Sequence, residues 1–530
     1  MLGLLVCLGV SAVYVSRNLQ PLLRRSVIDA LEARFHSPVE LDSLDISLLD
    51  GVQVRGQGLR ILRRAGPNEA NAAGSGTTPM LSVAHFSFST SLHDLVLLRA
   101  HLARVDVDGM ELHVPADRSG LLPKPKGDHK ARVELSIGEV HCARVKLVIQ
   151  TNKPGKEPLE FDIENLVLRN AGSGRAMSYV AEVVNPKPVG IVHATGHFGP
   201  WQGAEPRNTP LDGDYSFDNA DLSTIHGIGG TLSSTGHFSG KLSDIVIDGT
   251  TQTPDFTLDV SDHSEPLETR FHAIVDGTTG DTYLQPVQAR LGASSFTTAG
   301  KVVGIPDQGH DIALDVNMPH GRIQDLLRLG MKTQPPVMNG AVTMKAKLHI
   351  PPGKERVARK IQLAGTVQIQ NVEFNNPKIQ DRVDGLSLRA QGKPGEVKTV
   401  SSDGKPQVAS QMAVDFSLGH ALLTVNSLDY RIPGAQVKMD GVYSEDGNIF
   451  EFKGHLRTDA TPSQMVTGWK SALLKPFDPL FRRHGAGLEL PISVSGTKGD
   501  VHFGLAMHGA DQSPQAMAAE LRAKRHSARE

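Results

Sequence analysis

The sequence predicts a mainly β protein, with a long antiparallel sheet, one N-terminal transmembrane helix and few short helices. Residues 1–15 carry no charged side chain, which is typical of a membrane anchor. After Leu41 most segments alternate apolar and polar residues with a period of two, as half-buried strands do. The 53 Gly and 32 Pro with 5% aromatic residues indicate a turn-rich β chain, and 530 residues suffice for a large core.

Residues 1–16 are expected to form the transmembrane anchor. The apolar run is shorter than the roughly 20 residues that a bilayer core requires, and a cleaved signal peptide is the alternative. The stretch Ser11-Ala12-Val13 before Tyr14 matches a cleavage site poorly, so we favour an uncleaved anchor. Arg17, Arg24 and Arg25 alone would keep the following chain cytoplasmic, and charge therefore does not establish the orientation.

Residues 17–36 are predicted to form a juxtamembrane helix, because apolar residues recur there at helical spacing. Those residues are Leu19, Leu22, Leu23, Val27, Leu31 and Phe35. The period changes to two at Val39, where the strands begin. Residues 63–79 are small and polar without periodicity, which indicates an exposed loop.

The clearest alternation lies between residues 133 and 168, and it predicts half-buried strands in a meander. By alternation, nine residues are predicted to share one apolar face: Val133, Leu135, Ile137, Val145, Leu147, Ile149, Leu159, Phe161 and Ile163. Only residues 322–332 and a segment near Trp469 add further helix, which is too little to cover so many strands. Either the sheet folds over on itself or its apolar face lines a groove.

Charge and cysteine content exclude some functions. The 55 basic and 57 acidic residues give no overall positive field, so a nucleic-acid partner is not expected. Cys7 lies in the expected anchor, so Cys142 has no partner for an intramolecular disulfide.

Enzyme and metal motifs are broken or missing in the sequence. Residues 227–236 lack the Gly-Lys-Ser/Thr ending of a phosphate loop. Asp276-Gly277-Thr278 is similar to a phosphatase nucleophile motif, but Ile274 replaces the nucleophile. Two Gly-His-Phe segments, at 196–198 and 236–238, favour a repeated strand unit with exposed histidines over metal ligands. We therefore expect no catalytic residue, no cofactor and no metal.

An apolar and basic cluster lies near the end of the chain. Its members are Met465, Trp469, Leu473, Phe477 and Phe481 with Lys470 and Lys475. One hypothesis is that it caps a groove or contacts lipid headgroups. The alternative, which we favour because amphipathic helices usually pack against a core, is a helix and turn packed over the sheet edge. Residues 511–530 are expected to form a polar tail.

Two stretches resemble the AsmA-like family of bacterial envelope proteins. They are FHSPVELDSLDISLLDGVQVRGQGLRI, and ELSIGEVHCARVKLVIQ followed by PLEFDIENLVLRN. The segments 196–256 and 465–497 resemble an AsmA-like branch of similar length. The resemblance implies a curved sheet, a β-taco or groove, of the kind found in bridge-like lipid transfer proteins. It also implies a bacterial inner-membrane anchor through residues 1–15 and a periplasmic remainder.

The expected domains are a β region at 37–170, a middle β repeat region at 171–318 and a β region with helical insertions at 319–510. The function expected from this resemblance is binding or conduction of phospholipid in support of outer-membrane biogenesis. An outer-membrane or periplasmic protein is the expected further partner. A scaffold or assembly factor for outer-membrane proteins, with a filled core in place of a groove, is the alternative. A rod of about 150 to 190 Å is the expected upper length at 4.8 Å per strand.

Overall fold

The computed structural model describes most of the chain between residues 21 and 505. The described residues are 21, 24–25, 27–29, 31–32, 37–47, 52–64, 77–90, 101–114, 136–150, 158–171, 176–186, 188–202, 205–225, 227–261, 263–332, 334–355, 357–399, 408–444, 449–481, 487–497 and 500–505. The expected anchor and the expected polar tail lie outside these ranges. Within them, no helix is long and apolar enough to cross a membrane.

The protein is mainly β, as predicted, and the 25 strands among its described residues belong to one sheet. The strands are β1 (Val39–Glu40), β2 (Ser43–Ser47), β3 (Val52–Arg64), β4 (Thr77–Thr90), β5 (His101–Val114), β6 (Ser136–Ile149), β7 (Leu159–Ala171), β8 (Met177–Pro186), β9 (Val189–Phe198), β10 (Pro210–Asp221), β11 (Ile228–Gly229), β12 (Thr231–Lys241), β13 (Asp244–Leu258), β14 (Ser264–Val275), β15 (Thr282–Leu291), β16 (Ser294–Ile305), β17 (Gly309–Arg322), β18 (Met338–Ile350), β19 (Gln362–Phe374), β20 (Gln411–Gly419), β21 (Leu422–Ile432), β22 (Ala435–Ser444), β23 (Ile449–Thr458), β24 (Leu488–Thr497) and β25 (Asp500–Leu505).

Neighbouring strands in the chain are neighbours in the sheet, so the fold is essentially a meander. β1 and β2 both pair with β3, and β11 pairs with β13 beside β12. Each pairing is antiparallel except that of β5 with β6, which is parallel. The sheet is therefore mixed, and the prediction of an antiparallel sheet holds for the other pairs of described strands.

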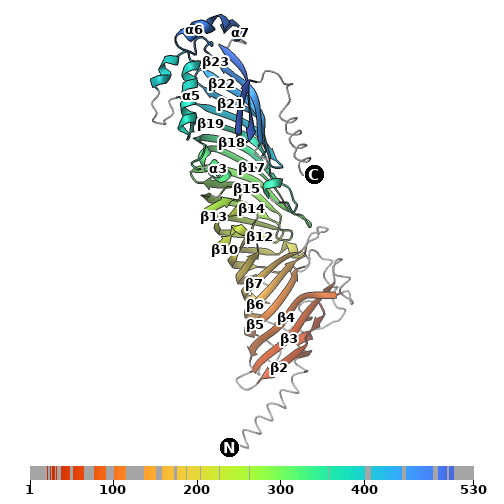
Figure 1. The fold of residues 1–530 in the computed structure, drawn as a ribbon. Helices are drawn as coiled ribbons and strands as arrows, with labels where there is room; N and C mark the ends of the chain where they lie inside the picture. The colour runs from red at the N-terminus through yellow and green to blue at the C-terminus, as the bar shows by residue number, and fades with distance from the viewer. Residues whose placement is uncertain are drawn as a thin grey trace, which may run out of the picture.

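The sheet is elongated, with the strands stacked like rungs from the N-terminal end to the C-terminal end (Figure 1). Because β1 and β2 share one place beside β3, and β11 and β12 share one beside β13, the strands occupy 23 places. At about 4.8 Å each these span roughly 110 Å, which is below the expected upper limit. The expected domain boundaries at 170/171 and 318/319 fall within β7 and β17. The strands thus continue across both boundaries in a single sheet.

Short helices pack against this sheet. They are α3 (Ile323–Gly330), α4 (Val357–Lys360), α5 (Pro377–Ala390), α6 (Trp469–Leu474) and α7 (Asp478–Phe481), with 3-10 turns η2 (Pro206–Asn208), η3 (Leu222–Thr224), η4 (Pro394–Thr399) and η5 (Lys475–Phe477). α3 covers the buried cluster of Met318, Val342 and Ile369, and α5 packs against Ile432 and Ala435. α3 falls within the predicted helix at 322–332. α5 was not predicted, although Asn376 caps its N-terminus by accepting from the Lys378 amide and Pro377 follows the cap.

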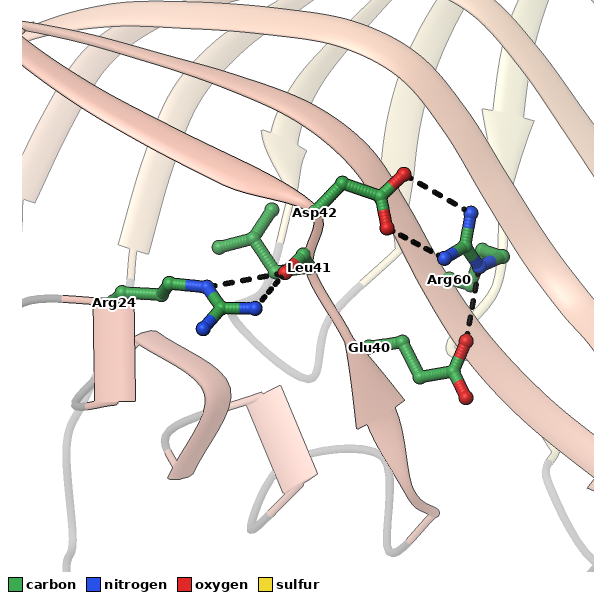
Figure 2. Close-up of polar contacts among 5 residues, drawn as sticks. All are labelled: Arg24, Glu40, Leu41, Asp42 and Arg60. Carbon is green, nitrogen blue, oxygen red and sulfur yellow. Dashed lines mark hydrogen bonds and ion pairs between the residues drawn. The ribbon is translucent and has the colours of Figure 1, made fainter. Parts of the chain in front are cut away.

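The start of the sheet is tied to the chain that precedes it (Figure 2). Arg24, in a helical stretch of the expected juxtamembrane segment, donates through Nε to the Leu41 carbonyl over 3.1 Å. Arg60 of β3 forms ion pairs with Glu40 at 3.0 Å and Asp42 at 2.6 Å. These contacts fix β1 and the turn before β2 against β3, where Leu41 and Leu44 begin the core.

Candidate functional site

One face of the sheet carries an apolar row that crosses almost all of its strands. We name it the central row, and it consists of residues that lie directly opposite one another on successive strands. Its members are Ile46, Val54, Phe88, Val105, Val140, Leu168, Tyr179, Gly196, Gly213, Phe238, Ile247, Ala273, Leu284, Gly300, Leu314, Leu348, Leu363, Leu418, Leu423, Tyr443, Phe450 and Gly496. Every strand from β2 to β24 except β11 contributes one residue. None of these residues is charged.

A few side chains of the central row are buried, but most are only partly shielded from solvent. Val54, Val105 and Ala273 are buried, at 2%, 8% and 3% exposure. The large aliphatic side chains from β17 to β21, including Leu314 and Leu348, are only half-buried. Because both neighbours of each residue in the row are also uncharged, a long apolar molecule lying across the strands would meet no charge along the row.

Aromatic rings on this face lie over glycines of the adjacent strand. Phe86 is opposite Gly56, and Phe271 is opposite Gly249. A Cβ atom added to Gly56 would come within 2.1 Å of the Phe86 ring, and one added to Gly249 would come within 2.7 Å of the Phe271 ring. Since no side chain separates ring and backbone, the rings lie low against the sheet. This packing keeps the apolar face shallow.

Near the N-terminal end, the apolar alternation changes phase within each strand from β3 to β7. We call the positions of this change the phase-shift line: Gly58, Ala84, Gly109, Arg144 and Glu164. Gly58, Gly109 and Arg144 have positive φ angles of 65°, 66° and 53°. Such local distortions shift which side chains face the core, as β-bulges do. Val140 and Cys142 therefore share a face with Val145 although their numbers differ in parity.

The structure brings six of the nine predicted apolar-face residues together. Three directly opposed pairs form on β6 and β7: Val145 with Ile163, Leu147 with Phe161, and Ile149 with Leu159. Val145, Ile149 and Ile163 are buried, and the other three pack against buried clusters that include Leu242. These six residues lie on the far side of the phase-shift line from the central row. They belong to a filled section of the face.

The remaining three predicted residues stand apart. Val133 and Leu135 lie outside the described residues. Between Ile137 and the ion-paired Glu139 and His141 the pairing of β6 is interrupted at Gly138, opposite Ala103 and Asn170, and Asn170 has a positive φ of 60°. The place of Ile137 in one set with Val145 therefore stays a prediction, since Ile137 lies directly opposite Leu102, which is 4% exposed. The residues of β6 that the prediction missed are Val140 and Cys142, which the hydrophobic cluster around Val145 includes.

The apolar and basic cluster near the chain's end lies at the far end of the sheet (Figure 1). Trp469, Leu473 and Phe477 are exposed, at 70%, 56% and 48%, and Lys470 and Lys475 are exposed beside them. Met465 is half-buried, and its sulfur lies 3.8 Å from the Thr458 hydroxyl. Phe481 ends α7, and its side chain is outside the described ones. The cluster is thus separate from the β6 and β7 residues.

The opposite face of the sheet is polar. His237 lies between Asp214 and Asp248 on the adjacent strands, and His272 follows Asp248. Their ion pairs measure 3.0 Å for His237 with Asp214 and 2.8 Å for His272 with Asp248. Among the described residues, no group of three or more His, Cys, Asp and Glu side chains has the arrangement of a metal site. The histidines form cross-strand pairs with carboxylates.

An open hollow of about 520 Å³ also lies at this polar face. His85, Asp108, His141 and Asn165 contribute to its lining. Two of its charged groups pair with each other, Arg104 with Asp106, and Arg144 pairs with Asp108 and lowers the pKa of that carboxyl. The charged lining sets this hollow apart from the uncharged central row.

No protein-family model, curated protein or solved structure in the comparisons matches this chain. The residues themselves therefore carry the functional argument.

Two titratable groups on the apolar face, Cys142 and Tyr179, are uncharged near neutral pH. Burial raises the pKa of the Cys142 thiol to about 12, and burial is also the main cause that raises the pKa of Tyr179. Both groups stay neutral near pH 7, so neither adds charge to the face. The arrangement suits binding of uncharged, chain-like apolar groups through burial.

Proposed function

We propose that the protein binds phospholipid acyl chains along the central row and conducts them along the sheet. In this proposal residues 1–16 anchor it in a bacterial inner membrane, the sheet lies in the periplasm, and the transfer supports outer-membrane biogenesis. The observation that carries the proposal is the uncharged row that continues strand by strand from β2 to β24. The resemblance of the sequence to AsmA-like envelope proteins supports it.

The energetics of acyl binding require no specific site. Each methylene removed from water contributes about 0.8 kcal/mol, so a chain of about 14 methylenes has up to roughly 11 kcal/mol available. A half-buried row covers only part of each chain, which reduces that value. Partial cover also favours movement, because similar residues follow at each strand and no single position holds the ligand much more tightly than the next. Such transfer needs no catalytic residue and no cofactor.

The alternative is a scaffold or assembly factor for outer-membrane proteins, and one observation favours it. Between β3 and β7 the apolar face is filled: Val83, Cys142 and Val145 are each at most 4% exposed. A filled core has no room for an acyl chain. The two functions therefore differ in whether lipid occupies the sheet beyond this section.

Lipid content of the purified protein tests the proposal. The full chain would be extracted from membranes in mild detergent and examined by native mass spectrometry with lipid extraction. We expect several phospholipids per chain, and fewer in the Leu348→Glu variant, which places a charge in the central row. Lys347→Glu, whose side chain is 85% exposed on the opposite face, is the matched control and should retain the lipid. A lipid-free, folded wild-type chain would favour the scaffold.

A further inference from the structure

We infer that the segment from Trp469 to Phe477 is a docking surface for an anionic lipid bilayer at the C-terminal end of the sheet. Three large apolar side chains, Trp469, Leu473 and Phe477, form what we call the cap patch. Trp469 and Leu473 are the most exposed large hydrophobic residues of the described chain, at 70% and 56%. They are spaced four residues apart in sequence, so they follow one side of α6 and η5. Apolar side chains gathered in this way mark interaction surfaces.

The cap patch is exposed although its segment is held firmly to the protein. The Asp478 carboxylate accepts hydrogen bonds from the Ser463 amide at 3.0 Å, the Ser463 hydroxyl at 2.6 Å and the Thr461 hydroxyl at 3.0 Å. The Ser471 hydroxyl donates to the Ser463 carbonyl over 2.7 Å. The polar side of the segment thus faces the protein, whereas α6 has no buried residue. This is the reverse of a helix that packs over a sheet edge.

The positive charge beside the cap patch favours an anionic bilayer as its partner. The stretch WKSALLKPF from Trp469 to Phe477 contains Lys470 and Lys475 and no acidic residue. Both lysines are exposed, and Asp478, the next residue, points its carboxylate toward Ser463. A tryptophan and other apolar side chains flanked by lysines match the interface of an anionic bilayer, where the rings enter the headgroup region and the ammonium groups meet phosphate.

The cap patch lies at one end of the long sheet. α6 and α7 lie at the end of the sheet opposite to β2 and β3 (Figure 1). The inference does not require that the sheet carries lipid, because bilayer contact at the cap and acyl binding on the central row use different residues. If both hold, the sheet connects a bilayer at the cap with the membrane of the proposed N-terminal anchor.

Fluorescence of Trp469 tests the inference in the full chain. The chain has two tryptophans, and a Trp201→Phe background leaves Trp469 as the reporter. Vesicles of brominated phosphatidylglycerol and phosphatidylcholine should shift its emission to the blue and quench it. Brominated phosphatidylcholine alone should bind about tenfold less well, because the lysines then meet no net charge. Quenching should weaken as salt rises.

Variants make the test specific to the cap patch. Leu473→Ser with Phe477→Ser should lower vesicle quenching about tenfold without changing the circular dichroism spectrum, since both side chains are exposed. Ile449→Ser, a 40% exposed apolar position on β23, is the matched control and should leave quenching unchanged. Trp469 emission that anionic vesicles leave unaltered while the chain floats with them would overturn the inference. Concentration-dependent dimerisation abolished by the double serine variant would also overturn it, in favour of a second copy.

Discussion

Next to the phase-shift line in β6, Cys142 and Val145 are 4% and 3% exposed, whereas the central-row leucines of β17 to β21 remain half-buried. Both sections have the same alternation of apolar and polar residues. In the first, Val114 and Ile149 pack against Leu242, and the helical residues before β1 pack against the cluster of Leu41 and Leu44. Alternation therefore places a side chain on one face of the sheet, but it does not determine whether other side chains cover that face.

The largest expected difference between the two sections is their tolerance of a buried charge. Val145→Asp should lower the free energy of unfolding by about 4 kcal/mol, because an unpaired carboxylate would enter a filled core. Leu348→Asp should cost about 1 kcal/mol, because its side chain already reaches water. Denaturant melts of the full chain in detergent would measure both. Equal losses would remove the distinction between filled and open sections.

Thiol reactivity sharpens the same comparison. With its pKa raised to about 12, the Cys142 thiol is almost entirely protonated at pH 8 and is shielded from reagents. A Leu348→Cys variant in a Cys142→Ser background should react with a water-soluble maleimide at least about a hundredfold faster. Cys7→Ser would be present in both proteins. Comparable rates would mean that Leu348 is covered as fully as Cys142.

The ring-on-glycine packing predicts an effect in the middle of the sheet, where Phe271 of β14 lies over Gly249 of β13. Gly249→Ala should lower stability by about 1 to 3 kcal/mol, because the new methyl group would lie 2.7 Å from the Phe271 ring and displace it. Gly419→Ala is the control, since a Cβ there meets no atom within 4 Å. Thermal melts followed by circular dichroism would compare the two. A larger loss in Gly419→Ala would contradict the role of the rings.

The smallest effect concerns pH and the polar face of the filled section. Hydrogen bonds from His141 and Arg169 lower the pKa of Glu139 from 4.5 to about 2. The stabilisation from a depressed carboxyl pKa is present above pH 4.5 and disappears as pH falls through 2. Glu139→Gln should therefore lose less of its melting temperature between pH 5 and pH 2 than wild type. The difference should be small because Glu139 is exposed.

Much of the fold follows from the sequence because strand alternation is local. The mainly β class and α3 were predicted correctly from periodicity. The parallel pairing of β5 with β6 could not be predicted, because it depends on how residues 115–135 connect two strands that have ordinary alternation. α5 was missed because its apolar stripe is weak, although Asn376-Pro377 carried a capping signal.

The candidate site could be predicted only in part. Alternation identified the apolar run from Val145 to Ile149 but missed Val140 and Cys142, because Arg144 takes a positive φ angle that is rare for an arginine. The central row depends on register between strands, which a single sequence does not contain. The exposure of Trp469 and Leu473 likewise required the contacts of Asp478.

Photocrosslinking in living cells tests the central claim most directly. A photoreactive phenylalanine would replace Leu348 in the central row, Lys347 on the opposite face, or Val145 in the filled section. If acyl chains bind along the central row, phospholipid adducts should form at Leu348 and none at Lys347 or Val145. A Leu284→Trp block in the row, on β15, should change the adducts at Leu348 if lipid moves along the sheet. Adducts missing at Leu348, or equally abundant at Lys347, would contradict a lipid path on this face.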